Sequence, residues 1–509
     1  MLDAIGDVFV CSSVTWALQI VLVSLLWWRS AYPWSGVPSR VPPGPRPMIP
    51  ILGNFLQLEI DPRKQFAKFR RRYGDLFSLY IGNKHIIVLN GFETLQDLLV
   101  KRGYKLSDRL ETNSMEMLGG FKGIISTSGK LWREQRTVSL ALLQKLDSGK
   151  QSTEDKIQEE SVYLLDAIAK ENGMAFDPNL LLRNAVSNIT CNMLFGQRYD
   201  YDSDHFQLVL CIISETLKTV GISTAMNYFP FLEYLPGDVF GVGKMKANVK
   251  KFNEIIVDPV IKHNIDNYDP DNCNSFIALY LKEMYARRDA GEETTLDVEN
   301  LEHIVTEILA AGTEATTSTL RWLLLFMATN PEVQAKCYQD VQRHVGNGRK
   351  PVLTDHDNLI YVQAVITETS RLAAVIPLGA PRSVTEDMWY KGYRLPRNSM
   401  IITNLDSVLM DEKIWGDPKV FRPERFISED GKLIHREELI PFSMGKRKCM
   451  AETTAKSEVF LFFSHMIQRF RFITEPEKPA PLIESVFAAT NAPQAFKICA
   501  FPRSTPNQI

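Results

Sequence analysis

The stretch PFSMGKRKCMAE, residues 441–452, places a cysteine in a basic loop directly before a long amphipathic run. Gly445 permits a tight turn, and Lys446, Arg447 and Lys448 bring positive charge up to Cys449. Residues 450–470 have the spacing of an amphipathic helix. A helix N-terminus and nearby cations both stabilise a thiolate. These features fit a thiolate that binds iron and, equally well, a reactive nucleophile.

The composition restricts the class of protein. The chain has 509 residues, is 45% hydrophobic and carries a net charge of −2, so a large core is possible and no nucleic-acid partner is expected. The cysteines are scattered and form no CxxC pair. This spacing argues against a disulfide framework or a zinc cluster and fits a reducing compartment.

The N-terminal region has the pattern of a membrane anchor. Residues 8–28 carry no charge, end in two tryptophans and are followed by Arg29. A helix of about 20 apolar residues spans a bilayer, and the following basic residues predict a cytosolic remainder. A cleaved signal peptide is the less favoured alternative, because the basic residues follow the apolar run. We expect an anchor over residues 1–30, a proline-rich hinge over 31–50 and a catalytic domain over 51–509.

The remaining pattern predicts a mainly helical α+β protein with small sheets. Residues 75–91 read as two strands around a Gly-Asn turn, and short strands return within 383–402. Between them, residues 92–340 are dominated by amphipathic helical runs. The apolar loop at 228–241 is interpreted as either packed or in contact with a membrane.

One predicted helix is unusually long and contains the stretch AGTEATTSTL, residues 311–320. Thr294 and Asp297 have capping-box spacing and Pro331 ends the run, which gives a helix of roughly 45–50 Å. Gly312 costs about 1 kcal/mol relative to alanine inside a helix. The glycine beside Glu314 indicates either close helix packing or close approach of a flat group.

Several motifs together carry a family resemblance. Phe442, Gly445, Arg447 and Cys449 form F-x-x-G-x-R-x-C, which resembles the heme-binding signature of the cytochrome P450 family. Further family-like motifs occur in the expected order. They are Trp132 with Arg136 (W-x-x-x-R), AGTEAT at 311–316, Glu368 with Arg371 (E-x-x-R), and FRPERF at 421–426 with Arg425. The resemblance covers about residues 35–503 and is strongest to the microsomal animal branch that handles drugs, steroids and fatty acids.

The resemblance implies heme b as cofactor and a role for each matching residue. Cys449 would be the axial iron ligand, tuned by Phe442, and Gly445 would allow its turn. Trp132, Arg136, Arg382 and Arg447 would hold the heme propionates, although the related branch often has histidine in place of Arg382. Ala311 and Gly312 would lie against the heme. Glu368, Arg371 and Arg425 would form a structural network.

The same resemblance implies partners and substrates. Basic residues such as Lys446 and Lys448 would face NADPH-cytochrome reductase at the endoplasmic reticulum membrane. The pocket would be lined by Ala311, Ala315, Val375, Ile376, Leu378, Phe487 and the loop near residues 118–125. Because these residues are mostly apolar, the substrate is expected to be an apolar small molecule such as a sterol, fatty acid or xenobiotic.

One position departs from the family pattern. The family follows its acid with threonine, whereas Glu314 is followed by Ala315, and the next residue is Thr316. Since a helix turns about 100° per residue, Thr316 does not occupy the missing position. Three functions remain open: a monooxygenase using O2 and NADPH, with Glu314 or a substrate hydroxyl aiding proton delivery; a heme-thiolate isomerase or dehydratase acting on peroxides; and a heme-binding carrier or sensor.

Overall fold

The computed structural model describes residues 40–47, 52–118, 120–147, 152–234, 236–488 and 490–503, with a few isolated residues between 15 and 23. The chain divides into two compact units, one formed by residues 1–110 and 380–404 and the other by 111–379 and 405–509. The predicted anchor lies almost wholly outside the described residues. No described helix is long and apolar enough to cross a membrane.

The first unit contains the main sheet. Strands β1 (Leu76–Ile81) and β2 (Lys84–Leu89) form the expected antiparallel hairpin, and the sheet continues through β6 (Met400–Thr403) to β3 (Arg382–Ser383). β4 (Met388–Tyr390) and β5 (Tyr393–Leu395) form a separate hairpin. Helix α2 (Arg63–Tyr73) precedes β1 in the sequence, and α3 (Phe92–Gln96) follows β2. In the predicted hinge, Pro43 O accepts a hydrogen bond from Ser78 N, so this segment runs beside β1.

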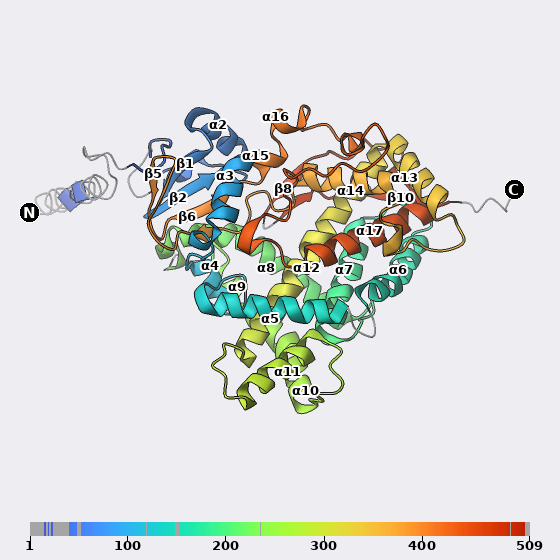
Figure 1. Cartoon of the computed structure of the whole chain (residues 1–509), viewed down its shortest axis with the longest axis horizontal. Coiled ribbons are helices and arrows are strands. Elements are labelled where there is room, and N and C mark those ends of the chain that lie inside the picture. The colour runs from blue at the N-terminus through green and yellow to red at the C-terminus, as the bar shows by residue number, and fades with distance from the viewer. Residues whose placement is uncertain are drawn as a thin grey trace, which may run out of the picture. The chain divides into compact units, whose positions relative to one another are not determined.

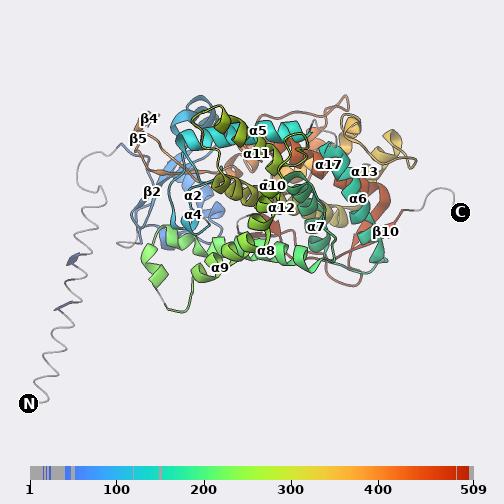
Figure 2. The same ribbon diagram turned by 90° about the horizontal axis from the view of Figure 1, so that it is seen from below.

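The second unit is mainly helical and is traversed by α12 (Figures 1 and 2). Its helices up to α12 are α4 (Asn113–Met117), α5 (Gly129–Asp147), α6 (Thr153–Lys170), α7 (Pro178–Phe195), α8 (Asp204–Ser223), α9 (Val242–Phe252), α10 (Asp258–Asp266), α11 (Phe276–Asp289) and α12 (Val298–Thr329). The later ones are α13 (Pro331–His344), α14 (Ile360–Ala373), α15 (Asp406–Leu409), α16 (Glu412–Trp415) and α17 (Glu452–Arg469). Short 3-10 turns include Pro423–Phe426 and Gly445–Arg447.

A two-stranded antiparallel sheet and a β-hairpin complete the second unit. Strand β7 (Phe470–Thr474) pairs with β10 (Ile498–Pro502), and β8 (Ser485–Phe487) pairs with β9 (Asn491–Pro493). The prediction of a mainly helical protein with small sheets is therefore confirmed for the described residues.

The central helix α12 begins and ends for local reasons. Asp297 is its N-cap, and the Asp297 carboxylate accepts the backbone N–H of Asn300 at 2.7 Å. Thr294, three residues earlier, instead donates its hydroxyl to Glu134. Pro331 stops the helix because it has no N–H to donate, and α13 starts there. Helix α12 packs beside α7, α14 and α17, and its last turns lie in the largest apolar core.

Candidate active site

The loop before α17 holds Cys449 in the turn that its sequence predicts. Gly445 has φ +73° and starts a 3-10 turn, and Lys448 N donates to Gly445 O at 3.0 Å. Cys449 N then donates to Phe442 O at 3.1 Å. The Cys449 side chain is exposed, whereas Cys191 and Cys337 are buried. The turn therefore presents this thiol outward at the start of a helix.

The charges around Cys449 act on the thiol in both directions. Although Cys449 is accessible from one side, the surrounding protein partly desolvates its thiol, and this desolvation and the charge of Glu452 raise its pKa. The backbone N–H of Ala451 and the cations Arg136 and Lys448 oppose this rise. Arg136 also donates to Lys448 O, which ties α5 to the cysteine loop. Coordination to a metal deprotonates a thiol outright. These neighbours therefore fit a cysteine that becomes a thiolate on binding iron.

The basic surface of this loop is partly neutralised. Lys448 and Lys456 both pair with Glu452 at 2.7 Å. Lys446 is exposed and makes no ion pair within the described part of the chain. The predicted basic face is consequently less positive than its sequence indicates.

Arg447 joins the cysteine loop to α5 and to the segment before α5. Its guanidinium carbon lies 3.9 Å from the centroid of the Trp132 ring. Its terminal nitrogens donate to Ile124 O, at 2.9 Å, and to Thr127 O. Trp132 is buried, and its Nε1–H has no hydrogen-bond partner among the described residues. A buried donor without a partner beside a guanidinium fits an anionic ligand such as a heme propionate.

The segment that Arg447 contacts is also held by α12. Glu307 accepts the backbone N–H groups of Ile124, at 2.7 Å, and Ile125, at 3.0 Å. Asn300 accepts the N–H of Gly123 at 3.1 Å. Burial raises the pKa of Glu307 to about 7, although the hydrogen bonds from these backbone N–H groups lower it. The loop predicted to line the pocket is thus fixed from two sides.

The middle of α12 presents small residues. Ala311 is exposed within the helix, and Gly312 is half-buried. A Cβ on Gly312 would lie only 3.0 Å from Thr190 Oγ1, so the glycine permits close packing of α12 on α7. This contact supports the helix-packing interpretation of Gly312. The expectation that Ala311 and Gly312 lie against heme stays a prediction, and the exposed Ala311 fits it.

The polar residues that follow face different neighbours. Thr316 is buried, and Thr313 accepts a hydrogen bond from Ser187 of α7 at 3.1 Å. Thr319 donates to Ala315 O at 2.9 Å. Glu314 is half-buried and accepts a hydrogen bond from Thr490, in the turn between β8 and β9, at 3.3 Å.

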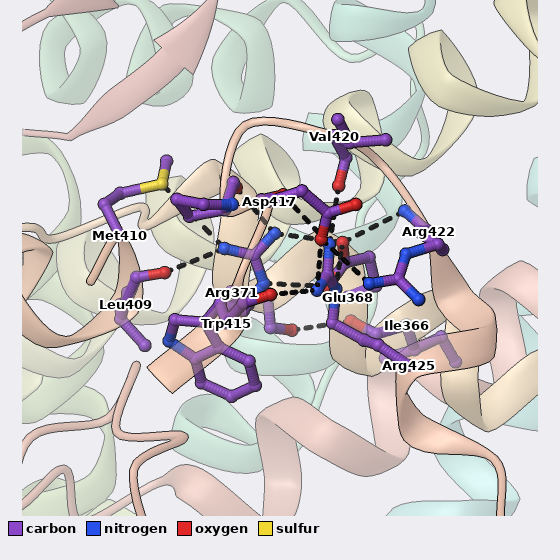
Figure 3. A network of polar contacts seen from close by, with 12 residues as sticks. Ile366, Glu368, Arg371, Leu409, Met410, Trp415, Asp417, Val420, Arg422 and Arg425 are labelled. Carbon is purple, nitrogen blue, oxygen red and sulfur yellow. Dashed lines mark hydrogen bonds and ion pairs between the residues drawn. The ribbon is translucent and has the colours of Figure 1, made fainter. Parts of the chain in front are cut away.

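Glu368, Arg371 and Arg425 form a buried ionic network (Figure 3). Arg371 donates to both carboxylate oxygens of Glu368, at 2.8 and 2.9 Å, and Arg425 Nε donates to Glu368 Oε1 at 2.9 Å. The other donors of Arg371 reach the backbone carbonyls of Leu409 and Pro418, and Arg425 also pairs with the Asp417 carboxylate at 2.9 Å. The network joins α14 to the segment that runs from α15 to the 3-10 turn at 423–426. Its role is therefore to hold these segments together.

The predicted pocket residues of the second unit come from segments that contact one another. Val375 O accepts the N–H of Asn491 in β9, at 2.8 Å. Ile376 is exposed, while Leu378 and Phe487 are half-buried. Arg382 lies in β3 of the first unit, buried and paired with Ile401, and its propionate role stays a prediction.

Two residues of this region were not identified from the sequence. Glu307 is one of several acids in α12, and only the fold shows that it holds residues 124–125. Thr490 lies near the C-terminus, and no local pattern connects it with Glu314. Both contacts join distant segments of the chain, so neither leaves a periodic signal in the sequence.

The exposed cysteine before a helix, the stacked arginine–tryptophan pair and the buried unpartnered donor fit a heme-thiolate protein. The family model for Cytochrome P450 matches residues 42–500, and the chain belongs to this family. Cytochrome P450 2J5 of Mus musculus is 36% identical over 470 residues, which cover 92% of each chain. Cytochrome P450 2J3 of Rattus norvegicus is 37% identical with the same coverage. Cytochrome P450 2U1 of Homo sapiens is 35% identical over 485 residues, 90% of this chain and 88% of the relative.

Membership of this family defines the general activity. The protein is a monooxygenase that binds heme b and uses O2 with electrons derived from NADPH.

Proposed function

We propose that this protein inserts one oxygen atom from O2 into an apolar small molecule, such as a sterol, a fatty acid or a xenobiotic. The observation that carries this proposal is the exposed Cys449 beside Arg447, which stacks on Trp132. The apolar character of Val375, Leu378 and Phe487 supports an apolar substrate.

Different residues of the second unit would hold different parts of the cofactor. Cys449 would hold the heme iron through its thiolate, Phe442 would pack near the sulfur, and Trp132, Arg136 and Arg447 would bind the propionates. When bound, heme supplies the oxygen-activating chemistry, and a thiolate ligand favours cleavage of the O–O bond. Ala311, which is exposed within α12, would lie against the flat cofactor, while Gly312 packs against Thr190 of α7. Glu314 is the acid closest in sequence to Ala311. Ala315 occupies the position of the family's threonine and lacks its hydroxyl, and Thr316 is the next residue.

The cellular arrangement is also part of the proposal. Residues 1–30 anchor the protein in the endoplasmic reticulum membrane and leave the catalytic domain in the cytosol. NADPH-cytochrome reductase docks at the face that carries Lys446, with Lys448 partly neutralised by Glu452. Charge complementarity at such a face mainly increases the association rate.

The test reconstitutes the full chain with heme, the reductase and NADPH in lipid vesicles. Sterols, fatty acids and xenobiotics are first screened for the spectral shift that accompanies substrate binding. We expect at least one bound substrate to gain a single oxygen atom from isotopically labelled O2. Rearrangement of a peroxide without NADPH would instead support an isomerase or dehydratase. Binding of substrates without NADPH-coupled product would support a carrier or sensor and contradict the proposal.

A further inference from the structure

Thr490 lies in the turn between β8 and β9 and reaches the acid of the central helix. Its Oγ1 donates a hydrogen bond to Glu314 Oε1 at 3.3 Å. Thr490 is only 9% exposed, so bulk water competes poorly for this bond. The contact therefore joins α12 to the hairpin that carries the predicted pocket residue Phe487.

The residue next to Thr490 fixes the turn in place. Asn491 donates its backbone N–H to Val375 O, at 2.8 Å, and its side-chain amide to Ala373 O, at 2.6 Å. Asn491 O accepts the indole N–H of Trp322 in α12 at 2.9 Å. With these three bonds beside it, Thr490 has its backbone held and its hydroxyl directed at α12. Such a hydroxyl loses little conformational entropy when it binds the carboxylate.

No hydroxyl of α12 itself makes this bond. Thr317 and Ser318 lie three and four residues after Glu314, yet their buried hydroxyls have no hydrogen-bond partner among the described residues. Thr319 donates to Ala315 O instead. Thr490 is therefore the only hydrogen-bond partner of the Glu314 carboxylate within the described part of the chain.

The cations near Glu314 act without a hydrogen bond to it. Arg183 of α7 and Arg321 of α12 both interact electrostatically with Glu314, and burial lowers the pKa of both guanidinium groups. Arg321 donates instead to the backbone carbonyls of Pro493 and Gln494. These cations attract the carboxylate but do not fix its rotation. The bond from Thr490 is the directional constraint.

We propose that Thr490 is a positioning residue that supplies, from the β8–β9 hairpin, the hydroxyl partner of Glu314 that Ala315 lacks. Thr490 holds Oε1, and Oε2, which makes no hydrogen bond within the described residues, is left to exchange hydrogen bonds with water or with a substrate hydroxyl. This inference rests on the proposed monooxygenase function and on the sequence-based expectation that Glu314 aids proton delivery. The acid, Glu314, then lies on helix α12 and its hydroxyl partner, Thr490, on the β8–β9 hairpin, whereas the family pattern has both on adjacent residues of one helix.

The first experiment tests the contact by itself. Unfolding by denaturant is compared for the wild-type full chain, Thr490→Val, Glu314→Leu, which has no acceptor for the Thr490 hydroxyl, and the double variant. We expect the shift in the denaturation midpoint of the double variant to be smaller than the sum of the two single shifts, because each change removes the same bond. Thr329→Val is the matched control, since the Thr329 hydroxyl donates to Leu325 O of its own helix. Additive shifts for Glu314 and Thr490 would overturn the contact.

The second experiment tests positioning during turnover with a substrate found in the binding screen. Loss of one hydrogen bond corresponds to about a fivefold change in an equilibrium or rate. We expect Thr490→Val to raise the hydrogen peroxide released per NADPH by about this factor, with little change in substrate affinity. Thr490→Ser should restore the wild-type value. Adding Ala315→Thr to Thr490→Val should also restore it, because the hydroxyl returns to the helix.

Two outcomes of the second experiment would overturn the proposal. One is unchanged peroxide release in Thr490→Val, with only the substrate affinity altered, which would make Thr490 a binding residue. The other is failure of both Thr490→Ser and Ala315→Thr to restore coupling. If the wild-type protein forms no oxygenated product, the proposed function fails, and the unfolding experiment still decides whether the contact exists.

Discussion

The guanidinium of Arg447 stacks on the ring of Trp132, with its central carbon 3.9 Å from the ring centroid. Arg447 is two residues from Cys449, and Trp132 lies in the first turn of α5. The pair therefore joins the cysteine loop to the helix that also carries Arg136. The same arginine reaches Ile124 O, so one side chain connects three segments of the proposed heme site.

Replacing Trp132 by phenylalanine should weaken heme retention without unfolding the protein. The substitution keeps an aromatic surface for Arg447 but removes the buried Nε1–H. A hydrogen bond to a charged group contributes ~1.5–3 kcal/mol, so heme loss should accelerate about tenfold or more. The rate of heme transfer to an excess of a heme-binding scavenger measures this. Equal rates for the wild type and Trp132→Phe would show that the indole N–H does not bind the cofactor.

Replacing Glu368 by alanine should strongly destabilise the second unit. The change leaves the guanidinium groups of Arg371 and Arg425 buried without their shared carboxylate. Removing one partner of a buried ion pair costs about 3–5 kcal/mol. Denaturant unfolding measures the loss, and Asp166→Ala, which breaks the exposed pair with Arg469, should cost at most about 1 kcal/mol. Similar losses for the two variants would contradict a structural role for the network.

Replacing Glu458 by glutamine should remove a pH dependence of stability. Glu458 lies buried in α17, its Oε2 has no hydrogen-bond partner among the described residues, and desolvation raises its pKa to about 8. The folded protein therefore keeps a proton that the unfolded chain releases, and stability falls as pH rises from about 5 to 8. Over this window the free energy of unfolding of Glu458→Gln, relative to wild type, should rise by roughly 1.4 kcal/mol per pH unit.

Denaturant titrations at several pH values measure this difference. Glu452→Gln is the control on the same helix: Glu452 is ionised in both the folded and the unfolded state from about pH 5 to 8, so the difference between this variant and wild type should stay constant over that window. Burial would raise the pKa of Glu452, but hydrogen bonds from Lys448 and Lys456 outweigh it and lower the pKa. A difference between wild type and Glu458→Gln that stays constant with pH would show that Glu458 is not desolvated in the folded protein.

Replacing Glu307 by alanine should loosen the segment before α5. The change removes the acceptor of the backbone N–H groups of Ile124 and Ile125. Hydrogen exchange of these two amides should become faster, since a lost acceptor leaves them open to water. Glu307→Gln, which keeps one carbonyl oxygen, should give an intermediate rate. Unchanged exchange in Glu307→Ala would show that Arg447 and Asn300 hold this segment without Glu307.

Local sequence patterns predict the elements of this fold well. The strand pair within residues 75–91 and the end of α12 before Pro331 follow from turn and proline chemistry. The predicted capping box at Thr294 misplaces the helix start by one turn. Asp297 caps α12 because Thr294 is used to bind Glu134, a residue of another helix. Tertiary contacts of this kind leave no signal in the local sequence.

The candidate site likewise contains features that local sequence motifs predict and contacts that only the fold shows. The cysteine loop and the Glu368–Arg371 pair are local, so each carries a short motif by which the family resemblance indicates it. The contacts of Glu307 with residues 124–125 and of Thr490 with Glu314 depend on which segments pack together. The sequence also indicates a more basic loop than exists, because the pairing of Lys448 and Lys456 with Glu452 depends on helix geometry.

The central claim is that Cys449 is the axial ligand of the heme iron, and carbon monoxide tests it most directly. The difference spectrum of the reduced, heme-loaded full chain is recorded with carbon monoxide for the wild type and Cys449→Ser. We predict the absorption band typical of thiolate ligation in the wild type and its loss in the variant, with Cys273→Ser unchanged. A thiolate-type band that persists in Cys449→Ser would contradict the account.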